Sequence, residues 1–211
     1  MPLSDIQERC ASIILRLPEA NGFALAGGAA LIVHEVSDRG THDIDCFGPS
    51  VAAVDRLAPV AVTALEADGF VVTVIVMATG FAKLVVEDES GRTQVDLGFD
   101  PATRPPLLTR LGPVRDLADL AGDKLLALFG RAASRDFIDV SGLLAHFSRS
   151  EIVGLAAAKD RGFSVEVLAE AFGVLATYDR VDEFPFLSDE TYRQLLATFS
   201  SWRTELRSLA D

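Results

Sequence analysis

Two aspartates separated by one residue are the clearest sign of chemistry in this sequence. Asp43 and Asp45 flank Ile44 in the stretch THDIDCF. Successive side chains of a strand point to opposite faces, so the two carboxylates share one face while Ile44 enters the core. Carboxylates about 6–7 Å apart along a strand repel each other unless a cation lies between them. The pair therefore predicts a site for a hard divalent metal, and Mg²⁺ usually combines one or two protein carboxylates with substrate phosphates.

A Gly-Gly turn precedes the two aspartates in the chain. Gly27 and Gly28 lie between a short apolar strand, residues 23–26, and a helix expected over residues 28–36. Free backbone amides at the start of a helix favour phosphate. A phosphate cradle close to a metal-binding carboxylate pair predicts nucleotide chemistry.

The loop before the aspartates adds two candidate nucleotide-binding side chains. Thr41 precedes Asp43 by two residues, so in an extended segment its hydroxyl points to the same side. Arg39 could clamp a phosphate from the same loop. Ordinary loop roles remain the alternative for both residues.

A third carboxylate is expected from a strand further along the chain. After a helix over residues 51–68, strands are predicted at 71–77, 81–88 and 92–99, and the turn residues between them favour an antiparallel meander. In the last strand, Asp96 alternates with apolar residues and lies on the polar face. Asp96 can therefore meet the Asp43–Asp45 pair.

The end of the third strand leads into a proline-rich connector, residues 100–114, which is the clearest candidate boundary. The predicted domains are residues 1–104 and 105–211. The pattern after the connector is helical to the end of the chain, with helices expected near 115–129, 134–147, 149–160, 164–176 and 189–208.

The order of these motifs resembles the nucleotidyltransferase superfamily, whose signature is a Gly-Gly or Gly-Ser turn followed by a D-x-D strand. Within it, LAGDKLLAL around Lys124 and RDFIDV around Asp139 look like segments of the AbiEii-type toxin branch of type IV toxin–antitoxin pairs. The resemblance covers roughly residues 20–147. It implies an α+β fold, in which a nucleotidyltransferase-type N-terminal domain with a small mixed sheet flanked by helices precedes a helical C-terminal region.

The resemblance also implies roles for individual residues. Lys124 would steady a triphosphate, and the alternative for this lysine on an apolar helix is a plain salt bridge, either interdomain or with Asp139. Ala29 stands where the superfamily usually has Ser or Thr, whose hydroxyl holds a phosphate. In related toxins the position of Thr41 can carry an inhibitory phosphoryl group. The expected catalytic residues are Asp43, Asp45, Asp96, Lys124 and Asp139; the nucleotide-binding residues are Gly27, Gly28, Arg39, Thr41 and Lys124; the metal ligands are Asp43, Asp45 and Asp96.

The implied activity is transfer of NMP from an NTP to an acceptor hydroxyl, with Mg²⁺ as cofactor and Mn²⁺ as a substitute. The acceptor could be the 3′ end of tRNA, with an antitoxin protein as partner. One alternative is a small-molecule acceptor such as an antibiotic. Another is a degenerate, non-catalytic protein that binds nucleotide or a partner.

Composition constrains these readings. The 211 residues carry a formal net charge of −12, which repels nucleic acid at long range. An RNA acceptor would need a local basic patch, for which six cations are candidates: Arg104, Arg110, Arg115, Lys124, Arg131 and Arg135. No apolar run is long enough to cross a membrane. Two cysteines without metal-site spacing, and an N-terminus without a secretory pattern, predict a cytoplasmic protein.

Overall fold

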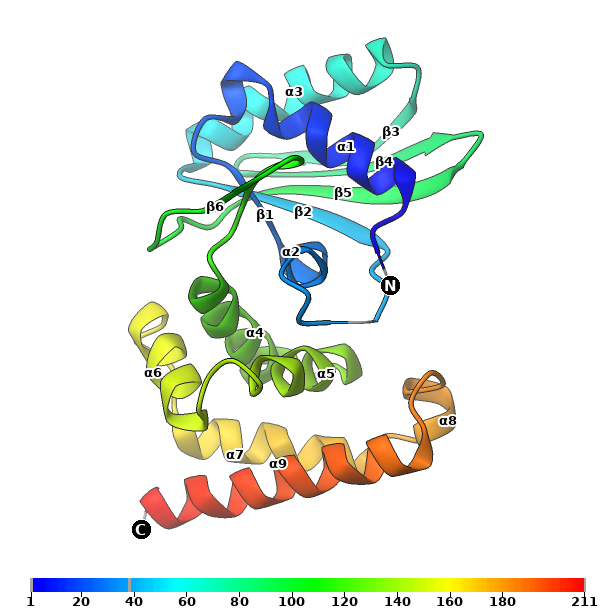
Figure 1. Ribbon diagram of the computed structural model, residues 1–211. Helices are drawn as coiled ribbons and strands as arrows, with labels where there is room; N and C mark the ends of the chain where they lie inside the picture. Colours follow the sequence, from blue (N-terminus) through cyan, green and yellow to red (C-terminus); the bar gives the residue numbers. More distant parts are fainter. Residues whose placement is uncertain (1, 38, 211) are drawn as a thin grey trace. The chain divides into compact units, whose positions relative to one another are not determined.

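The computed structural model describes residues 2–37 and 39–210, and its contacts divide the chain into two compact units, Met1–Leu120 and Ala121–Asp211. Figure 1 shows the first in blue to green and the second in green to red. Within the described residues, all strands belong to the first unit, and the second is helical. The predicted α+β class is confirmed.

The first unit is built on a seven-stranded mixed sheet with the strand order β3-β4-β5-β2-β1-β7-β6. Its strands are β1 (Ala24–Ala26), β2 (Asp43–Gly48), β3 (Val71–Ala78), β4 (Phe81–Asp88), β5 (Gly91–Phe99), β6 (Leu107–Thr109) and β7 (Gly112–Val114). Its helices are α1 (Asp5–Leu15), α2 (Gly27–Val33) and α3 (Val51–Ala67), with a short 3-10 turn, η1 (Pro18–Ala20). The predicted meander β3-β4-β5 is antiparallel, as expected.

Alternation along β2 assigns the two faces of the sheet. Ile44 and Cys46 are fully buried, whereas Asp43, Asp45 and Phe47 are partly exposed. Helices α1 and α3 cover the buried face, and α2 lies on the other side (Figure 1). Burial raises the pKa of the Cys46 thiol, so this cysteine stays neutral. The expectation that Ile44 turns away from the aspartates is confirmed, and Cys46 lies on the same buried face.

The proline-rich connector is shorter than predicted. Residues 107–114 form the β6-β7 hairpin, and Val114 of β7 lies beside Leu25 of β1 in parallel register. The hairpin therefore belongs to the first unit, and the contacts divide the chain after Leu120, whereas the sequence pattern placed the boundary after residue 104. Both strands have only three residues and β7 contains Pro113, so they give almost no alternation signal, which explains the difference.

The second unit consists of helices that pack around aromatic side chains. They are α4 (Leu117–Arg131, which begins in the first unit), α5 (Ser134–Leu143), α6 (Arg149–Lys159), α7 (Val165–Val174), η2 (Leu175–Thr177), α8 (Arg180–Glu183) and α9 (Asp189–Ala210). The ring centroid of Phe199 lies 5.0 Å from those of Phe137 and Phe172, in edge-to-face geometry. None of the helices in the described ranges combines the length and the apolar character of a membrane span.

The start of α5 is fixed by a buried carboxylate. Asp136 is fully buried and accepts hydrogen bonds from Arg131 Nε (2.9 Å) and Nη2 (2.7 Å) and from the backbone N–H of Ala133 (3.1 Å). The cation of this network is Arg131, which ends α4. Asp136 is therefore a cap at the α4–α5 junction.

Replacing this cap should destabilise the second unit. Asp136→Ala leaves the partners of a buried carboxylate unsatisfied, so we expect a loss of about 3 kcal/mol in the free energy of unfolding. Urea titration followed by circular dichroism measures it, with Asp182→Ala in α8 as a surface control. A loss no larger than that of the control would show that Asp136 does not hold the junction.

Candidate active site

The Gly-Gly turn and the D-x-D strand meet at Gly27. Antiparallel pairing of β1 with β2 places Ala26 opposite Asp45, and Gly27 follows with a φ of +61°. A Cβ atom built on Gly27 would lie 1.8 Å from Asp45 Oδ2. The carboxylate of Asp45 therefore rests against the backbone of the turn, where both the conformation and the space require glycine.

The second glycine lies beneath the loop that precedes β2. A Cβ on Gly28 would lie 2.9 Å from Thr41 Oγ1 and 3.2 Å from Arg39 Nη2. The Thr41 hydroxyl donates to Asp43 Oδ1 at 2.5 Å. The structure thus brings together Gly27, Gly28, Arg39, Thr41, Asp43 and Asp45, the predicted residues of the first half of the site.

The loop is held by a residue that sequence reasoning missed. Gln7 of α1 is 5% exposed, and its Nε2 donates to the backbone carbonyl of Thr41 at 2.9 Å. Its Oε1 accepts from the N–H of Ser4, which completes the capping box of α1. The S-x-x-Q pattern signals that cap in the sequence, but the second hydrogen bond of the same side chain depends on the tertiary structure.

Asp96 joins the site through the parallel pairing of β2 with β5, in which it lies opposite Asp45. Lys83 of β4 forms an ion pair with it, with Nζ 3.1 Å from Asp96 Oδ2. Sequence reasoning missed Lys83, although a signal existed. The tight turn at residues 89–90 pairs Asp88 with Gly91. Counting away from this turn along both strands places Lys83 of β4 opposite Asp96 of β5.

These carboxylates fit a metal only together with a substrate. Among residues 2–37 and 39–210, no three His, Cys, Asp or Glu side chains converge as a ready-made metal site. Asp96 Oδ1 is nevertheless buried without a hydrogen-bond partner, while Oδ2 faces Lys83. Asp43 and Asp45 supply two hard oxygen donors beside it, and phosphate oxygens complete such a set for Mg²⁺.

The two predicted residues of the second unit contact each other. Lys124 of α4 and Asp139 of α5 form an ion pair of 2.8 Å, and the residues are 8% and 0% exposed. The plain ion pair considered for Lys124 is thus present in this structure. Their expected roles toward a triphosphate stay predictions.

Ala29 is fully buried in the first unit. A serine hydroxyl here would therefore have to find its partner in the interior. The burial disfavours the expectation that this side chain faces a phosphate.

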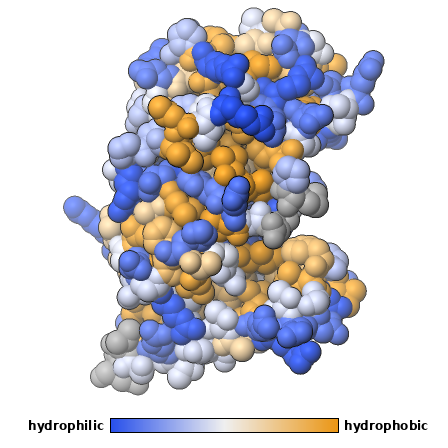
Figure 2. Space-filling view, in the orientation of Figure 1, coloured by the Kyte–Doolittle hydropathy of each residue, from blue (hydrophilic) through white to orange (hydrophobic). Residues whose placement is uncertain are grey.

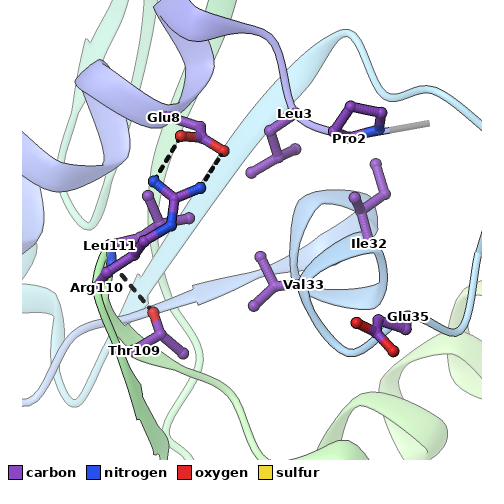
Figure 3. A pocket seen from close by; sticks show the side chains of 9 residues that line it. All are labelled: Pro2, Leu3, Glu8, Ile32, Val33, Glu35, Thr109, Arg110 and Leu111. Carbon is purple, nitrogen blue, oxygen red and sulfur yellow. Dashed lines mark hydrogen bonds and ion pairs between the residues drawn. The ribbon is translucent and has the colours of Figure 1, made fainter.

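A separate hollow lies on the first unit, near the N-terminal end of α1 (Figure 3). It has a volume of about 320 Å³ and apolar walls from residues such as Leu3, Ile32 and Leu111. Arg110 lies at its edge in a two-pronged ion pair with Glu8 (2.7 and 2.8 Å). Figure 2 shows apolar side chains over β6 and around α2 on this face. None of the predicted site residues lines the hollow.

Comparison with solved structures defines the class of the protein. The chain aligns over 99% of its length with 96% of JHP933 from Helicobacter pylori, with a TM-score of 0.62 and 15% identity. It also aligns over 94% of its length with 83% of the nucleotidyltransferase toxin MenT4 from Mycobacterium tuberculosis H37Rv, with a TM-score of 0.61 and 17% identity. The alignment with a protein described as a putative nucleotidyltransferase from H. pylori has a TM-score of 0.58 and 15% identity. It covers 98% of this chain and 99% of that one. The fold is that of nucleotidyltransferases.

The family follows from the sequence match. The family model described as nucleotidyl transferase AbiEii toxin, type IV TA system, matches residues 11–201. The chain therefore belongs to the AbiEii nucleotidyltransferase toxin family. Membership implies an NTP substrate and an antitoxin, and enzymes of this family are typically metal-dependent. A search of curated proteins found no match.

Gly27→Ala should abolish nucleotide binding. The new Cβ would displace Asp45 Oδ2, and the positive φ adds roughly 1–2 kcal/mol of strain. Gly69→Ala is the matched control, since Gly69 also has a positive φ but no atom within 4 Å of its Cβ position. Calorimetric titration with Mg²⁺ and NTP, beside urea unfolding, separates the two effects. Nucleotide binding retained in Gly27→Ala would show that this turn is not part of the site.

Lys124 and Asp139 should be strongly coupled in stability. Removing one partner leaves a buried charge uncompensated, so Lys124→Met and Asp139→Leu should each cost about 3 kcal/mol. The double variant should cost no more than either single one, and a double-mutant cycle of urea unfolding measures this. Additive losses would mean that the two residues do not depend on each other.

Proposed function

We propose that this toxin is a metal-dependent enzyme that transfers NMP from an NTP to an acceptor hydroxyl. The observation that carries the proposal is the contact of the Asp45 carboxylate with the backbone of the Gly27–Gly28 turn. The contact supports the proposal because a carboxylate that would bind a metal then lies beside backbone amides that would bind phosphate. The balance of the reaction is simple: an acceptor oxygen bonds to the α-phosphorus, the bond from that phosphorus to the bridging oxygen breaks, and pyrophosphate leaves.

Asp43 and Asp45 would hold the Mg²⁺ ion, with Mn²⁺ as a substitute. When bound, such an ion neutralises phosphate charge and polarises the reacting phosphoryl group. The hydrogen bond from Thr41 to Asp43 orients that carboxylate. Arg39, which lies over Gly28 beside Thr41, would bind a phosphate of the NTP.

Asp96 is suited to accept the proton of the attacking hydroxyl or to complete the metal site. Its Oδ1 is buried without a partner, so it is available to a proton or a cation, while Lys83 holds Oδ2. In the second unit, Lys124 would contact the triphosphate, with Asp139 positioning it through their ion pair. Asp139 is then a positioning residue for Lys124.

The acceptor we propose is the 3′ end of tRNA, on the basis of the family. Most cations of the local basic patch considered for it are already paired with carboxylates. Of six candidate cations, five form ion pairs with carboxylates: Arg104 with Asp119, Arg110 with Glu8, Arg115 with Asp100, Lys124 with Asp139 and Arg131 with Asp136. Recognition would therefore depend on the acceptor end and not on the tRNA body. The same acidity favours a cationic small molecule, such as an aminoglycoside, as the second candidate.

Asp45→Asn should abolish transfer and leave the fold intact, since removing one of two adjacent carboxylates relieves repulsion in the metal-free protein. Each radiolabelled NTP is incubated with Mg²⁺ and either total tRNA or an aminoglycoside, and the labelled product identifies the acceptor. Thermal melts test binding in the wild-type protein. Mg²⁺ and NTP together should raise its free energy of unfolding by roughly 2–3 kcal/mol at about a hundredfold excess over Kd.

Glu89→Gln, on the exposed β4–β5 turn, is the control, since it removes one charge away from the site. No label on either acceptor and no thermal shift with any of the four NTPs would refute the proposal. A metal-free melting temperature many degrees lower in Asp45→Asn would mean that Asp45 is structural.

A further inference from the structure

The face of the sheet that carries Asp43 and Asp45 presents its side chains in rows. Pairing of β2, β5, β4 and β3 places residues of the same face opposite one another. One row holds Asp45, Asp96, Lys83 and Val76. The next row, two residues further along each strand, holds Phe47, Gly98, Phe81 and Ala78. A purely apolar row thus follows directly after the charged row of the site.

Two phenyl rings converge over the glycine of this row. A Cβ on Gly98 would lie 3.1 Å from both Cδ1 and Cε1 of Phe47 and 3.7 Å from Cδ2 of Phe81. The rings come from the strands on either side of β5 and lean into the space that the glycine leaves. Both phenylalanines are only partly buried, so part of this surface is open.

The distance between the rows suits a nucleotide. Two residues along an extended strand span about 6–7 Å, a separation that one ribose bridges between a base and its phosphate. A phosphate held at Asp45 would therefore place its base over the second row. Flat aromatic side chains bind bases by stacking, and this works for any base because every base has a π face.

We propose that Phe47 and Phe81, with Gly98 between them, form the nucleobase-binding platform of this enzyme. The inference rests on the proposed function, since it needs a nucleotide phosphate at the carboxylate row. The base is that of the incoming NTP or that of the terminal nucleotide of the acceptor. Either has the same chemistry, and the experiment distinguishes them.

The test compares ligands with and without a base. Phe47→Leu and Phe81→Leu keep apolar volume but remove the flat ring, so the fold should persist. Each should weaken NTP binding about fivefold, at the low end of the effect of stacking, and leave Mg²⁺–tripolyphosphate binding unchanged. Phe99→Leu is the matched control, because Phe99 is an exposed phenylalanine on β5 that alternates to the opposite face from Gly98. Calorimetry gives the dissociation constants.

The outcomes distinguish the two sources of the base. They also distinguish a failure of the platform from a failure of the proposed function. Unchanged NTP affinity with a fivefold higher KM for the acceptor would assign the platform to the acceptor's terminal base. Equal losses for NTP and tripolyphosphate, or no change in either NTP affinity or acceptor KM, would overturn the platform while leaving the proposed function standing. A wild-type protein that binds neither NTP nor tripolyphosphate would instead refute the proposed function, and the platform with it.

Discussion

The parallel pairing of β2 with β5 is the interaction on which the site depends. It places Asp45 beside Asp96 although 51 positions separate them in the chain. Strand β2 also pairs with β1, which ends at the Gly-Gly turn. The central position of β2 therefore joins the turn and both carboxylates on one face, while α1 and α3 bury the other. A register slip of one residue would turn the carboxylates into the core.

Concentrating negative charge at this face requires compensation, and the structure supplies it locally. Lys83 neutralises Asp96 from the neighbouring strand, and Thr41 donates to Asp43. Asp45 lies against a glycine of the turn. Gln7 ties the loop to α1 and so holds the Thr41 donor in place. The carboxylates are thus positioned by hydrogen bonds and an ion pair before any substrate binds.

Ion pairs with buried aspartates join consecutive helices in the second unit. Lys124–Asp139 and Arg131–Asp136 both connect α4 with α5. Each has an aspartate that is completely buried, so its charge depends on its cation. This dependence fixes the two helices against each other. It also means that a lysine expected to bind a triphosphate already has an anionic partner.

The sequence by itself determined the placement of the two carboxylates on one face of a strand. Alternation around Ile44 correctly predicted which face carries Asp43 and Asp45, because the two-residue period of a strand is a local property. The motif order also identified the family. Local pattern likewise located the meander and most helices, since each has a clear periodicity and turn residues at its ends.

Tertiary structure decided which residues complete the site. Gln7 reaches Thr41, and the β6-β7 hairpin enters the sheet beside β1, through contacts between distant segments that leave no local periodicity. Five of the six candidate cations proved to be neutralised by carboxylates, four of which lie at least 15 positions away. Phe47, Gly98 and Phe81 form one surface only because β5 lies between β2 and β4. Sequence periodicity predicts the face of a strand, but the neighbours of that strand are chosen by the packing of the whole sheet.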